Sequence, residues 1–80
     1  MANITYYVVL PFVRTEDGLT AEHAVEAPSR AAAISQARLA ATTMAGAVAF
    51  VRTGDPSLGE FTDAEVLAKF GEVPEDLSEY

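Results

Sequence analysis

The first apolar segment of the chain runs from Ile4 to Arg14 and is rich in β-branched and aromatic residues, which are typical of β-strands. Both faces of this predicted strand are apolar. One side carries Ile4, Tyr6, Val8, Leu10 and Phe12, and the other carries Tyr7, Val9 and Val13. Two apolar faces predict a central strand. Pro11 favours an edge strand instead, because its nitrogen donates no hydrogen bond.

A hairpin is predicted after the first strand. Asp17-Gly18 is a strong turn signal, because a type I′ turn requires positive φ at both of its central residues. The segment from Leu19 to Ala27 alternates as a second strand does. A two-residue turn at Asp17-Gly18 pairs Phe12 with His23, and this register places the large residues of both strands on one face.

A helix is predicted after Pro28, with Ser29 as its N-cap. Its apolar side chains form one stripe of mostly small residues, which lets the helix lie close to a sheet. The stripe consists of Ala33, Ile34, Ala37, Ala40, Ala41 and Met44. Ala45-Gly46 ends the helix. The apolar segment from Ala47 to Arg52 predicts a third strand, which turn-forming residues end at 54–57.

A second, short helix is predicted over Asp63–Phe70. Thr62 and Glu65 have the spacing of a capping box, in which each side chain bonds to the backbone amide of the other residue. Phe61 can pack on Val66 as a hydrophobic staple. Gly71 then stands at the C-terminal cap position.

These elements predict an α+β domain with the order β-β-α-β-α. The sheet is three-stranded and mostly antiparallel, with strand order 2-1-3, because the most apolar strand belongs in the middle. The order 1-2-3, which Pro11 favours, is the alternative. One alanine-rich helix covers one face, and the short C-terminal helix completes a single domain over residues 1–73. Residues 74–80 are predicted to form an acidic, frayed tail.

Composition and charge exclude several kinds of site and of binding partner. The 80 residues contain no cysteine and one histidine, which excludes disulfides and a structural zinc site of cysteine and histidine. The net charge is −7, and residues 55–80, with eight acids and one lysine, carry all of it. This charge has the wrong sign for a general nucleic-acid binder or for an anionic membrane surface. No signal or membrane-spanning segment is evident, which predicts a cytoplasmic protein.

No candidate catalytic, cofactor-binding or metal-ligating residue emerges from the sequence. His23 could serve as a general base, but no nucleophile or carboxylate is fixed beside it by local spacing, so we expect a partly buried sheet residue. Asp63 and Glu65 are explained by helix capping. Phe-Val-Arg-Thr occurs at 12–15 and again at 50–53, and predicts two strand ends. No phosphate-binding glycine loop is present, and no small-molecule ligand is inferred.

The first functional hypothesis is therefore a non-enzymatic protein-interaction module that self-associates as a homodimer. With the first helix over the face of Tyr6, Val8 and Leu10, the opposite face is an open apolar patch, which monomers rarely leave uncovered. The predicted interaction surface consists of Tyr7, Val9, Val13, Ala49 and Val51. The alternative is an acidic regulator whose C-terminal third docks on a basic protein surface. An enzyme is the least favoured class, because it would need polar groups brought together from distant elements.

Overall fold

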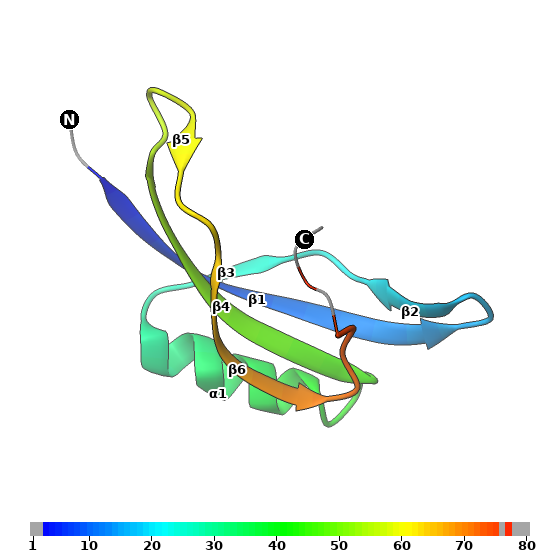
Figure 1. Cartoon of the computed structure of the whole chain (residues 1–80). Helices are drawn as coiled ribbons and strands as arrows, with labels where there is room; N and C mark the ends of the chain where they lie inside the picture. The colour runs from blue at the N-terminus through cyan, green and yellow to red at the C-terminus, as the bar shows by residue number, and fades with distance from the viewer. Residues whose placement is uncertain (1–2, 76, 78–80) are drawn as a thin grey trace.

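The computed structural model describes residues 3–75 and 77, and shows a curled antiparallel sheet with a helix against one of its faces (Figure 1). Within these residues there are six strands and one helix. The strands are β1 (Ile4–Thr15), β2 (Gly18–Ala21), β3 (Val25–Ala27), β4 (Gly46–Asp55), β5 (Glu60–Phe61) and β6 (Glu65–Gly71). The helix, α1, spans Arg30–Ala40.

The predicted fold class, a three-stranded sheet with two helices, is wrong. The segment predicted as a second helix contains β6, which pairs antiparallel with β4. Thr62 does not cap a helix: its hydroxyl donates to the Thr53 carbonyl at 3.0 Å and accepts from the Thr53 amide at 3.2 Å. Gly71 does have positive φ, but it ends a strand, and a Cβ there would lie 2.5 Å from the Ala45 carbonyl oxygen. When β6 pairs with β4, the backbone N–H and C=O groups along that edge of β4 form hydrogen bonds. These hydrogen bonds favour a strand more strongly than the local signals favour a helix.

β1 is the central strand of the sheet. It pairs antiparallel with β2 and β3 on one side and with β4 on the other, which agrees with the expected placement of the first strand. Pro11 is tolerated there because its carbonyl accepts a hydrogen bond from the Glu22 amide at 2.9 Å. The nitrogen of a strand residue points to the same neighbour as its carbonyl, so the missing donor of Pro11 faces the interruption between β2 and β3.

The hairpin register differs from the expected one. The turn residues are Glu16–Asp17, and Phe12 lies opposite Ala21 and not opposite His23. After the interruption the pairing shifts by one residue, so that Val8 lies opposite Glu26. A shift of one residue exchanges the two faces of a strand. As a result, β2 turns its apolar residues to the face of Phe12, whereas β3 turns Ala27 to the helix.

Helix α1 begins as the sequence predicts, because the Ala32 amide donates to the Ser29 hydroxyl at 3.1 Å. It covers the face of Tyr7 and Val9, and not the face of Tyr6, Val8 and Leu10. The buried residues of this core are mostly alanines from both the helix and the sheet: Val9, Ala27, Ala33, Ala37, Ala47 and Ala49. Small residues on both sides let the helix approach the sheet closely.

A second apolar cluster lies on the other face of the sheet. Leu10, Phe12 and Val48 are its buried members. Leu19 and Ala21 of β2 pack against them, together with Val73 and Leu77 of the C-terminal segment. The predicted tail over 74–80 lies partly outside the described residues, which include 74, 75 and 77 of it.

The turn between β4 and β5 is held by Asp55. The Ser57 hydroxyl and amide donate to Asp55 Oδ1 at 2.6 Å and 3.0 Å. The bond from the Ser57 hydroxyl is the main reason that the pKa of Asp55 lies below its ordinary value. The turn ends β4 as expected and returns the chain to Phe61, which joins the face opposite the helix.

Candidate interaction surface

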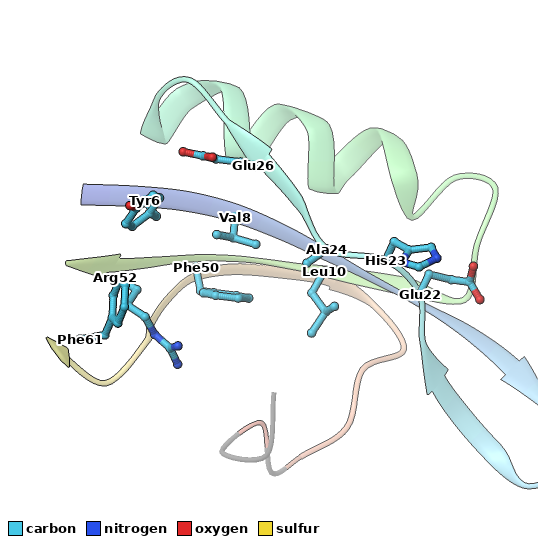
Figure 2. Close-up of a pocket in the computed structure, with 10 residues that line it drawn as sticks. All are labelled: Tyr6, Val8, Leu10, Glu22, His23, Ala24, Glu26, Phe50, Arg52 and Phe61. Carbon is cyan, nitrogen blue, oxygen red and sulfur yellow. The ribbon is translucent and has the colours of Figure 1, made fainter. Parts of the chain in front are cut away.

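The face of the sheet opposite helix α1 contains a hollow of about 670 Å³, which we call the open groove (Figure 2). It lies over β1, between β3 on one side and β4 and β5 on the other. Its lining residues are Tyr6, Val8, Leu10, Glu22, His23, Ala24, Glu26, Phe50, Arg52 and Phe61.

The floor of the open groove is apolar and aromatic. Tyr6, Val8 and Leu10 are successive outward positions of β1, and Phe50 lies opposite Val8 on β4. Tyr6 also meets Phe61, with ring centroids 5.9 Å apart and planes tilted by 50°. Tyr6, Val8 and Phe50 remain partly exposed, although they lie on the two longest strands of the sheet. A floor of this kind binds by burying apolar surface.

The first rim of the groove is acidic. Glu22, His23 and Ala24 come from the interruption between β2 and β3, and Glu26 comes from β3 itself. All four are exposed. Glu26 faces the groove only because the register shifts by one residue before β3. The interruption beside Pro11 thus creates the acidic rim.

The second rim carries a basic residue. Arg52 lies opposite Tyr6 on β4, and Phe61 lies next to it on β5. Among the described residues, the Arg52 Nε is buried and has no hydrogen-bond partner. The end of its guanidinium group points away from the sheet (Figure 2). This outer end of the guanidinium group is the part of Arg52 that an acidic group can reach.

The C-terminal segment covers another part of this face. Leu77 closes a small cavity with Leu10, Val48 and Phe50, on the β4 side of the groove. Glu72 forms an exposed ion pair with Arg14 at the end of β1, which holds the start of the segment. Figure 2 shows the segment passing on the side of β1 opposite Glu26. The groove is therefore a part of the face that the described residues leave uncovered.

The structure places three residues of the sequence-predicted surface, Tyr7, Val9 and Ala49, in the core beneath helix α1. Val9 is 3% exposed and Ala49 is 0% exposed, and Tyr7 packs against the same core. Val13 and Val51 are partly buried. Sequence reasoning missed the groove residues because it placed the helix on the wrong face. The alternation of Ala47 and Ala49 with larger residues was the available signal, since an alanine-rich helix packs best against alanines.

The position of His23 differs from the expected one. His23 is exposed on the acidic rim and does not pack opposite Phe12, which corrects the expected partly buried position. In residues 3–75 and 77 no cluster of three histidine or acidic side chains could hold a metal ion. Within the same residues no helix has the length and apolar character needed to cross a membrane. The arrangement is suited to binding an apolar surface flanked by charges.

Comparisons with known proteins do not assign the chain to a family. No family model matches it, and neither curated proteins nor solved structures show a significant match.

Proposed function

We propose that the chain is a small non-enzymatic interaction module that self-associates through the open groove. The observation that carries the proposal is the uncovered floor of Tyr6, Val8 and Phe50 on two long strands of the sheet. The free energy of the system falls when a partner removes such apolar side chains from water. The same face is already covered by the C-terminal segment where it is closest to Phe12.

A second copy of the chain is the occupant that the charges favour. The acidic rim and Arg52 flank the floor on its two sides. An isologous interface brings the same patch of both copies together, so a patch with both signs of charge can complement itself. A chain of 80 residues without cysteine also has a small core, and association is one way in which such chains gain stability.

A basic partner protein is the competing occupant. Glu60, Asp63 and Glu65 are exposed on and around β5 and β6, so the acidic C-terminal third carries its charge along this edge of the sheet. That field would also attract a basic surface. The apolar floor, however, needs an apolar contact, which charge alone does not supply.

Sedimentation velocity from micromolar to millimolar concentration tests the proposal. We expect a concentration-dependent dimer for the wild type. Val8→Glu should give a monomer, because it places a charge in the floor. Phe61→Glu, at a residue that is 44% exposed, should weaken the dimer without loss of folding. Leu39→Glu is the matched control, because Leu39 is 70% exposed on helix α1 and far from the groove.

Circular dichroism of each variant separates dissociation from unfolding. A wild type that stays monomeric at millimolar concentration contradicts the proposal and leaves the basic partner as the favoured occupant. Equal weakening by Leu39→Glu and Phe61→Glu also contradicts it, because the contact would then lie outside the groove.

A further inference from the structure

The two rims of the open groove lie at matching distances from β1. Val8 pairs with Glu26 of β3 on one side and with Phe50 of β4 on the other. Neighbouring strands are about 4.8 Å apart. Two copies can face each other across the groove, related by a two-fold axis that runs parallel to β1 between the two sheets. In that arrangement β3 of one copy lies above β4 of the other copy. Arg52 lies level with Tyr6, two residues from the level of Glu26, or about 7 Å along the strand.

We propose that Arg52 of one copy pairs with Glu26 of the second copy, and that these two pairs set the orientation of the dimer. This inference rests on the self-association proposed above. Packed sheets lie about 10 Å apart, a gap that one arginine and one glutamate side chain can bridge together. The carboxylate then accepts hydrogen bonds from the outer end of the guanidinium group, which points away from the sheet (Figure 2).

The other in-plane two-fold axis, perpendicular to β1, is disfavoured by the C-terminal segment. That axis, centred on Val8, would set Arg52 above Val48 of the second copy. Val48 is buried and packs with Val73 and Leu77, so the guanidinium group would meet an apolar cover. With the axis parallel to β1, Arg52 instead lies above β3 of the second copy and does not face Val48.

The acidic rim provides an internal control for the position of the pair. The Glu22 amide bonds to the Pro11 carbonyl, so Glu22 lies five residues from the level of Arg52, or about 17 Å along the strand. If general attraction between the rims held the copies together, Glu22 and Glu26 would be equivalent. In the proposed dimer only Glu26 reaches Arg52.

Mixing two charge-reversed variants tests the inference. In the Arg52→Glu homodimer, each new glutamate faces Glu26 of the other copy, and the like charges repel. In the Glu26→Arg homodimer, each new arginine faces Arg52 of the other copy and is repelled in the same way. We expect each single variant to dimerise about tenfold more weakly than the wild type, since each exposed pair occurs twice. In a mixture of the two variants, both pairs have opposite charges. Native mass spectrometry should then show the mixed dimer in excess over either homodimer.

The control mixture contains Arg52→Glu and Glu22→Arg, and it should show no such excess. An equal excess in both mixtures would overturn the assigned pair. If neither mixture favours the mixed dimer while Val8→Glu still dissociates the wild-type dimer, the inference is wrong and the proposed function stands. A monomeric wild type overturns both.

Discussion

The two faces of the sheet are covered in different ways. On the helix face, Ala47 and Ala49 of β4 meet Ala33 and Ala37 of helix α1, and all four are buried. On the other face the sheet presents larger side chains, and the described part of the C-terminal segment covers the region around Phe12. The comparison shows that the small side chains lie on the face that the helix covers and the larger ones on the other face.

The difference follows from how side chains fill space. Protein cores pack at the density of organic crystals, and a short helix with an alanine stripe can reach that density only against a surface of small residues. The face of Leu10, Phe12 and Phe50 is too bulky for such a helix. The result is one closed face and one face with an apolar hollow.

The largest expected effect concerns two phenylalanines of the open face. Phe12 is fully buried, so Phe12→Ala should lower the free energy of unfolding by about 3–5 kcal/mol. Phe61→Ala should cost about 1 kcal/mol, mainly through the lost ring contact with Tyr6. Denaturant unfolding of dilute protein measures both. Similar losses at the two positions would show that the groove is as well packed as the covered part.

The next effect tests the close approach of the helix. Ala37→Leu inserts bulk between helix α1 and the sheet and should cost about 1–3 kcal/mol. Ala31→Leu, at an exposed position of the same helix, is the control and should change stability little. Thermal unfolding followed by circular dichroism compares them. A tolerated Ala37→Leu would mean that the alanines do not decide the face.

The smallest effect tests β5, which carries Phe61 to the open face. Thr62→Val removes the two hydrogen bonds between the Thr62 hydroxyl and the Thr53 backbone, and should cost about 1 kcal/mol. Thr62→Ser keeps the hydroxyl and should retain most of that stability. Chemical unfolding in urea resolves the difference. Indistinguishable midpoints for the two variants would show that these bonds add nothing.

Local signals in the sequence predict β1 and the start of helix α1. The β-branched run of β1 and the Ser29 cap each depend on a few neighbouring residues, and the structure contains both. The residues at 62–71 carry equally clear local signals for a helix, but Glu65–Gly71 form a strand instead. Their conformation is set by pairing with β4, which a local pattern does not contain.

The open groove depends on two features that are not local. One is the face chosen by helix α1, which placed the predicted surface of Tyr7 and Val9 in the core. The other is the one-residue shift beside Pro11, which turns Glu26 toward the groove. The sequence shows that Pro11 is unusual in a central strand. It does not show the register shift in the neighbouring strand, because that shift depends on which strands pair.

The two neighbouring tyrosines of β1 test the central claim, because Tyr6 lies in the groove and Tyr7 lies beneath helix α1. Fluorine NMR of protein labelled with fluorotyrosine, assigned with Tyr→Phe variants, follows each ring separately. We predict that the Tyr6 resonance shifts between micromolar and millimolar protein, and with Phe61→Glu, while the Tyr7 resonance stays constant. A concentration-dependent Tyr7 resonance with an unchanged Tyr6 resonance would contradict the account.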